Sequence, residues 1–231
     1  MSGFYSNPIN RFDSEIKEEE ALKIPIVTKV ITTFLSYIFH PVFIPVYVTL
    51  FLLYIHPSAF TGFSTSNKQR TLVIVCLNLV FFPILSVVLL KAVGFIDSLF
   101  LKTRKDRIIP YIACGIFFFW TYTVFKQQPA YPLLLVSYVL GLFLSSSAAL
   151  LANIYYKVSM HAIGLGGCLG LFLIVMQTES MLMTLPISVA VLITGLVSSS
   201  RLVLNSHKPF EIYTGLIIGI ITQFIAAYVV L

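Results

Sequence analysis

Three short polar clusters stand between the long apolar stretches of this sequence, at residues 102–107, 157–161 and 200–211. Each contains cationic side chains, and the second and third add serine and histidine. Ionisable groups within or beside apolar spans are costly to bury, so they invite a functional interpretation. A basic cluster beside a span is also a common orientation signal, and a single histidine at a helix start is often a cap. The case for a site therefore depends on the clusters acting together.

Together the clusters carry the groups that are needed to bind and cleave a phosphate ester. Two or three cations can hold the phosphate oxygens, and Arg201 offers a planar bidentate fork. Ser159 can donate a further hydrogen bond, and a helix that starts after His161 adds backbone N–H groups and a favourable dipole. Of the two histidines, one would act as nucleophile and the other as general acid. Glu211 follows His207 by four residues, so on a helix its carboxylate can accept the imidazole N–H and fix the tautomer.

The elements that must position these residues are membrane-spanning helices. The chain has 231 residues, of which 58% are hydrophobic and 10% charged, and its mean hydropathy is +0.95. These charges are too few to cover a soluble domain of this size. The apolar runs are far longer than strands and lack the alternation of a membrane barrel. We therefore expect an all-α fold, a polytopic transmembrane helical bundle of six or seven spans.

A spanning helix needs about 20 apolar residues, and this length divides the chain into candidate spans. The first contains a kink or break at His40-Pro41 and Pro45, which is why the count is six or seven. Residues 1–25 are expected to form a polar tail, and residues 26–231 a single transmembrane domain. The expected spans are roughly 26–55, 71–95, 108–126, 132–155, 159–176, 182–200 and 209–231.

The span count predicts which face of the membrane each cluster occupies. Two spans separate the first cluster from the second, and two more separate the second from the third. Each pair returns the chain to the face from which it left, so all three clusters are expected on one side.

Other polar or small residues have simpler interpretations. His40 and His56 stand beside prolines in the first stretch, where an interfacial residue is more common than a ligand. The pairs Gly166/Gly170 and Gly215/Gly219 have the GxxxG spacing that lets helices approach closely. Such glycines fit contacts within the bundle and contacts between copies alike, so the sequence leaves the oligomeric state open.

The third cluster, Ser200-Arg201-x5-His207-x3-Glu211, resembles the third signature of the type 2 phosphatidic-acid phosphatase superfamily, which is written SR-x5-H-x3-D. The triplet 159–161 resembles the second signature, P-S-G-H, and residues 102–110 resemble the first, K-x6-R-P. The order along the chain is the same, and the resemblance covers roughly residues 95–231. Several departures stand out. Glu211 replaces aspartate, Met160 replaces glycine, and Val158 replaces proline. Four residues rather than six separate Lys102 from Arg107, which does not directly precede Pro110, and two spans between the first and second clusters are unusual for lipid-active members.

The resemblance implies a metal-independent, cofactor-free phosphatase that hydrolyses a lipid phosphate or prenyl pyrophosphate through a phosphohistidine. By this analogy His207 attacks phosphorus, His161 protonates the leaving oxygen, and Glu211 orients His207. Arg104 could replace either Lys102 or Arg107 as a phosphate ligand. The residues expected to bind the substrate phosphate are Arg201, Arg107, Lys102, Ser159 and Arg104.

Two other classes of function remain open at this point. An inactive member of the superfamily would serve in the membrane as a lipid-binding or interaction subunit. A transporter or channel is less favoured, because few charges lie near the centre of any expected span and no pair of broken helices stands out. The net charge of +6 does not point to nucleic acid, because the basic residues flank apolar spans. Membrane lipids and a phosphorylated substrate are the expected partners.

The distribution of basic residues and the resemblance to the superfamily point to opposite compartments for the clusters. Most of the basic residues outside the spans fall on the cluster side, which the positive-inside rule places in the cytoplasm. Bacterial members of the superfamily more often act on the outer face of the inner membrane. The expected location is a bacterial inner membrane, with the charge bias favouring a cytoplasmic site.

Overall fold

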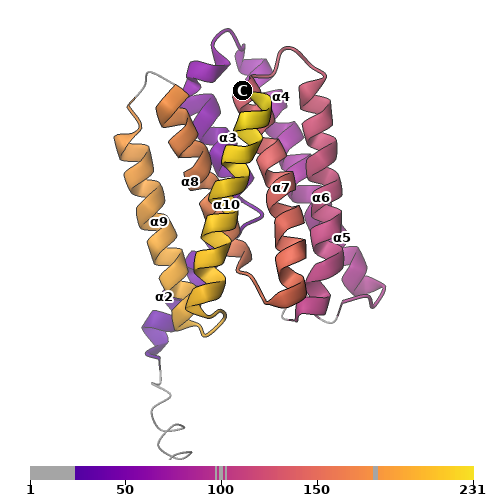
Figure 1. Cartoon of the computed structure of the whole chain (residues 1–231), viewed down its shortest axis with the longest axis vertical. Coiled ribbons are helices and arrows are strands. Elements are labelled where there is room, and N and C mark those ends of the chain that lie inside the picture. Colours follow the sequence, from indigo (N-terminus) through magenta and orange to yellow (C-terminus); the bar gives the residue numbers. More distant parts are fainter. Residues whose placement is uncertain (1–23, 97, 99–100, 102, 179–181) are drawn as a thin grey trace, which may run out of the picture.

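The computed structural model describes residues 24–96, 98, 101, 103–178 and 182–231. Every regular element in this part of the chain is a helix (Figure 1), so the all-α prediction is confirmed. Six helical segments are long and apolar enough to cross a membrane, which makes this an integral membrane protein. They are α4-η3-α5 (Thr65–Val75, Cys76–Phe81 and Phe82–Ala92), α6 (Arg104–Lys126), α7 (Leu133–Tyr155), α8 (Met160–Thr178), α9 (Thr184–Val203) and α10 (Pro209–Val230).

The first apolar stretch is a broken helix, with its break at His40-Pro41 as predicted. It consists of α2 (Ile26–Ile38) and α3 (Ile44–Leu50), and α3 continues into the π-helical turn η1 (Phe51–Ile55). The break follows from Pro41, which has no backbone N–H and disfavours helical geometry in the residue before it. In Figure 1, α2 lies at the end of the bundle where α9 meets α10, whereas residues 56–64, including the short helix η2 (Pro57–Phe60), lie at the opposite end. The stretch therefore runs the length of the bundle.

Three connections lie together at one end of the bundle, namely α5–α6, α7–α8 and α9–α10 (Figure 1). Each of the three polar clusters lies in one of these connections and extends into an adjoining helix. We call this the cluster end. The predicted common face of the clusters is confirmed for the described residues, and Lys102 lies outside them.

The glycine pairs let α8 and α10 cross in close contact. A side chain on Gly219 would overlap backbone atoms of Ile163 and Gly167, and one on Gly166 would overlap the backbone of Leu216. The predicted packing role of these glycines is confirmed. The crossing also joins the starts of the two helices, because the Ser159 N–H donates to the Glu211 carbonyl at 3.1 Å. The second and third clusters are thereby held side by side.

The first cluster is held near the second and third clusters because α6 packs against α7. Thr103 and Asp106 form a reciprocal capping box at the start of α6, which fixes where the helix begins. Arg104 Nη1 donates to the carbonyls of Ile154 and Tyr155, each at 3.0 Å. The start of α6 is therefore held against the end of α7, and Arg107 is placed one turn inside α6.

Candidate active site

A cavity of about 750 Å³ extends from the cluster end into the bundle. Its wall includes residues of α2, the α2–α3 break, η3, α5, α6, α7, α8 and the α9–α10 connection. Three of the four histidines in the chain line it, and among the described lining residues there is no carboxylate. The basic and histidine side chains in the wall are His40, Arg107, Lys157, His161, Arg201 and His207. This is a cationic cavity suited to an anion.

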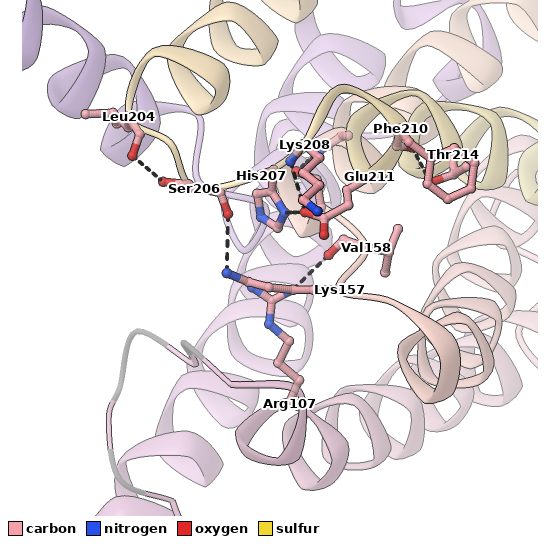
Figure 2. A network of polar contacts seen from close by, with 12 residues as sticks. Arg107, Lys157, Val158, Leu204, Ser206, His207, Lys208, Phe210, Glu211 and Thr214 are labelled. Atoms are coloured by element: carbon pink, nitrogen blue, oxygen red, sulfur yellow. Dashed lines mark hydrogen bonds and ion pairs between the residues drawn. The ribbon is translucent and has the colours of Figure 1, made fainter. Parts of the chain in front are cut away.

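His207 and Glu211 form a hydrogen-bonded pair at the start of α10. His207 precedes α10 and Glu211 lies in its first turn, four residues later. His207 Nδ1 is 2.8 Å from Glu211 Oε2, and the same oxygen accepts the Lys208 backbone N–H at 3.2 Å (Figure 2). The hydrogen bond predicted from the spacing is therefore present. Because an ionised carboxylate only accepts, it holds the proton of the neutral ring on Nδ1 and leaves the Nε2 lone pair available.

His207 is uncharged at neutral pH. Burial lowers its pKa to about 4, and the nearby cations Arg107 and Lys157 act in the same direction, while the hydrogen bond to Glu211 opposes them. A histidine in this state is a base or nucleophile across the physiological range.

Arg107 connects the first and second clusters. Its side chain is buried, and it donates from Nη1 to the Val158 carbonyl at 2.7 Å (Figure 2). Its Nε donates to the Leu101 carbonyl at 2.9 Å. It also lines the cavity. Two of its donors hold backbone, so Arg107 both shapes the wall and contributes positive charge to it.

Arg201 lies in the last turn of α9 and lines the cavity. Its Nε is buried and has no hydrogen-bond partner in the described part of the chain. Arg107 is close enough to repel its charge. A guanidinium that is short of acceptors and faces a second cation is in an environment that a bound anion would improve.

Lys157 also belongs to the site, although no specific role within the second cluster is predicted for it from sequence. Its Nζ donates to the Ser206 carbonyl at 3.2 Å and thereby links the second and third clusters (Figure 2). Burial lowers its pKa, with the nearby Arg107 and Arg201 adding to this and Glu211 opposing it. The signal that could have found it is its place at the start of the second cluster, four residues before His161.

His161 lies in the first turn of α8, where the sequence expected it, and lines the cavity. Its Nε2 is 3.1 Å from the Ser36 carbonyl of α2. A carbonyl only accepts, so Nε2 carries the proton in this contact. The other nitrogen, Nδ1, is the one that remains for a substrate.

Two further predicted residues serve the backbone. Ser159 is fully buried and caps α8, with its Oγ accepting the Ala162 N–H at 3.4 Å, and it does not line the cavity. Arg104 is exposed and points to the end of α7, as described above. The structure therefore brings together Arg107, His161, Arg201, His207 and Glu211, and places Ser159 and Arg104 outside the cavity wall.

The cavity changes character away from the cluster end. There the wall is apolar and comes from η3, α5, α6 and α7, with Leu79, Pro83, Val87, Phe118 and Leu142. Of the four lining residues that are exposed, Asn205 belongs to the α9–α10 connection, and the other three are apolar or aromatic, namely Tyr37 of α2 and Ile84 and Val88 of α5. The cavity therefore reaches the apolar surface of the bundle beside α2 and α5.

Comparison of the chain with family models, with curated proteins and with solved structures gave no match.

Proposed function

We propose that this protein is a membrane-embedded, metal-independent phosphatase that hydrolyses a lipid phosphate or prenyl pyrophosphate through a phosphohistidine. The observation that carries the proposal is the His207–Glu211 pair, which presents a neutral imidazole to a cavity lined by cations. The resemblance of residues 200–211 to the third signature of the type 2 phosphatidic-acid phosphatase superfamily supports the same assignment. The altered first and second signatures are compatible with it, because Arg107 and His161 still line the cavity.

In the proposed first step, His207 Nε2 attacks phosphorus and the bond from phosphorus to the leaving oxygen breaks. Arg201 and Arg107 stabilise the charge that spreads over the phosphoryl oxygens. Glu211 keeps the proton on Nδ1 and stabilises the positive charge that develops on the ring. In the second step, a water oxygen attacks phosphorus and the bond from phosphorus to Nε2 breaks, which releases inorganic phosphate and restores neutral His207.

His161 is the proposed proton donor to the leaving oxygen. In the neutral ring the single proton is on Nε2 and is donated to the Ser36 carbonyl. The donor would therefore be the cationic ring, which holds a second proton on Nδ1. The negative charge of a bound phosphate favours that second proton. Water that attacks the phosphohistidine would return its proton to His161.

The shape of the cavity supports a substrate with an apolar chain. Its cationic part suits a phosphate, and its apolar part reaches the outer surface of the bundle at Tyr37, Ile84 and Val88. A lipid could place its phosphate among the cations while its chain lies along the apolar wall and extends into the bilayer. A soluble phosphate ester would leave that wall unoccupied.

The direct test is phosphate release by the purified full chain from a panel of phosphatidate, phosphatidylglycerol phosphate and undecaprenyl pyrophosphate. We expect release from at least one of them, with the rate reduced by at least about 1,000-fold in His207→Ala. If no member of the panel is hydrolysed, or if His207→Ala retains the rate, the enzyme proposal fails. The second candidate, a non-catalytic lipid-binding subunit, then accounts for the cavity.

We further propose that the protein resides in a bacterial inner membrane with its cluster end in the cytoplasm, as the bias of basic residues favours. A cysteine placed at Lys208 should then be protected from a membrane-impermeant reagent in intact cells, and a cysteine at Lys126 should be labelled. The native cysteines are replaced beforehand. The reverse labelling pattern would put the site on the outer face.

A further inference from the structure

His40 brings a third histidine to the cavity from outside the stretch 95–231 that resembles a phosphatase. It lies in the break between α2 and α3 and lines the cavity. Its ring centroid is 5.4 Å from that of His161, with the two rings at 80°. Arg201 is close enough to act on its charge. His40 is therefore a neighbour of two residues to which the proposed reaction assigns roles.

The broken helix holds His40 in a defined conformation. Its backbone N–H donates to the Tyr37 carbonyl at 3.3 Å, and its carbonyl accepts the Phe43 N–H at 2.8 Å. Its Nδ1 accepts the Val42 N–H at 3.4 Å. An accepting Nδ1 places the proton of a neutral imidazole on Nε2.

The two touching rings differ in what they can still donate. The Nε2 proton of His161 is committed to the Ser36 carbonyl. No hydrogen bond leaves Nε2 of His40 toward any residue that the structure describes. In their neutral forms, His40 is the histidine of this pair that has a donor available to a ligand.

We propose that His40 is a phosphate-binding residue, whose Nε2–H donates to an oxygen of a tetrahedral phosphate group held between Arg201 and His207. The contribution to turnover rests on the proposed function, whereas the binding of the anion does not. The broken first helix is then part of the site: α2 binds His161 through Ser36, and the break supplies His40. The site is incomplete without residues 26–55.

Two amide substitutions separate this role from a structural one. His40→Gln places an N–H donor near the position of Nε2, whereas His40→Asn places an acceptor near the position of Nδ1, which is the atom that binds the Val42 N–H. If His40 binds phosphate, glutamine should restore the lost function. If His40 serves only the turn, asparagine should restore it. His40→Phe removes both groups and retains a ring of similar size.

Two measurements on the purified full chain are needed. The first is the rise in thermal midpoint on adding orthovanadate, a phosphate analogue that needs no turnover. The second is kcat/KM on whichever lipid phosphate the wild-type protein hydrolyses. We expect His40→Phe to lose about 10- to 100-fold in kcat/KM and to need a correspondingly higher vanadate concentration, as for a lost hydrogen bond to a charged group. His40→Gln should recover most of both responses, and His40→Asn should not.

Better function of His40→Gln than of His40→Asn supports the proposal, even if His40→Phe does not fold. Equal values for the two amides, or better function of His40→Asn, overturn it. A wild-type protein that hydrolyses none of the lipids but shows the vanadate response and its glutamine rescue would refute the proposed function and leave the His40 site standing. A wild-type protein with neither response refutes both.

Discussion

Both ends of the bundle carry basic residues and histidine, but the surroundings of these side chains differ between the two ends. At the end opposite the clusters, Lys126 is exposed and Lys68 partly so, and each lies over a tyrosine ring, with Nζ 5.5 Å from Tyr122 and 5.7 Å from Tyr54. At the cluster end, Arg107 is buried and Lys157 donates across to another connection. At the cluster end Arg107, Lys157 and Arg201 share a cavity with three histidines.

The surroundings of the histidines also differ between the two ends. His56 is buried at the opposite end, stacked on Phe51, with its Nδ1 3.1 Å from Ser58 Oγ. His207 has a carboxylate as its partner and faces a cavity. Burial alone is thus compatible with a purely structural histidine. A carboxylate partner, a cavity and neighbouring cations together identify a candidate for chemistry.

The largest expected effect follows from removing the carboxylate that distinguishes His207 from His56. In Glu211→Gln the amide is no longer confined to accepting a proton, so the ring can adopt the other tautomer and lose its nucleophilic Nε2. We expect kcat for phosphate release to fall by about 100- to 10,000-fold, with folding unchanged by gel filtration in detergent.

Glu211→Asp is the matched variant for this change, because it keeps the charge and shortens the arm. It should retain more activity than Glu211→Gln. If the two variants are equally active, or if both match the wild-type protein, the carboxylate does not act through His207.

A smaller effect on kcat/KM is expected from removing the cation Arg201 at the cluster end, with Lys126 at the opposite end as the matched control. Arg201→Met should lower kcat/KM for phosphate release by about 10- to 100-fold, as for a lost hydrogen bond to a charged group. Lys126→Met should leave kcat/KM unchanged. Because Arg201 has a buried Nε without a partner among the described residues and is repelled by Arg107, its removal should not lower the thermal midpoint in the absence of phosphate. A fall in midpoint without a loss of activity would make Arg201 a structural residue.

The pH dependence of kcat/KM gives a finer test. A nucleophilic histidine acts in its neutral form, so the acid limb should lie near the lowered pKa of His207, about 4, and below the ordinary 6.5. Lys157→Met removes a cation that lowers this pKa, so the limb should move to higher pH by about half a unit. An acid limb that stays in place in the variant, or that lies at 6.5 in the wild-type protein, would contradict the assignment.

The same shift has a consequence for stability. Between pH 6.5 and 4 the unfolded chain binds a proton at His207 that the folded chain does not, so stability falls as the pH drops through this window. Above it the contribution is fully present.

The last variant concerns the crossing that joins the second and third clusters. Gly219→Ala would place a Cβ against backbone atoms of Ile163 and Gly167, so α8 and α10 must separate. We expect a loss of about 1–3 kcal/mol, as for other overpacked sites, seen as a lower thermal midpoint. Gly195→Ala in α9 is the control, because nothing lies within 4 Å of the added atom; it should be neutral or slightly stabilising. Equal midpoints in the two variants would mean that the crossing tolerates separation.

Much of this arrangement could be predicted from local patterns. Apolar lengths predicted the bounds of the spans to within six residues, and the pairing of spans put the clusters at one end. The four-residue spacing of His207 and Glu211 on a helix anticipated their hydrogen bond. Each of these depends on the geometry of a single helix or on counting crossings.

The remaining features depend on how elements distant in sequence pack. His40 was expected to be interfacial, and it reaches the cavity because α2 and α3 bring the break against α8. Arg104 and Arg107 look interchangeable in sequence, yet Arg104 donates to the carbonyls at the end of α7, and only Arg107 lines the cavity. The burial of Ser159 as a cap follows from the α8–α10 contact, which the motif does not reveal.

In the proposed mechanism, His207 becomes phosphorylated during turnover. The wild-type protein is mixed with the lipid phosphate that it hydrolyses, quenched within the first turnover in alkaline detergent, where phosphohistidine survives, and analysed by peptide mass spectrometry. We expect a phosphate on His207, and none on His56 or in His207→Asn. Turnover without phosphate on His207, or with the phosphate on another residue, would contradict it.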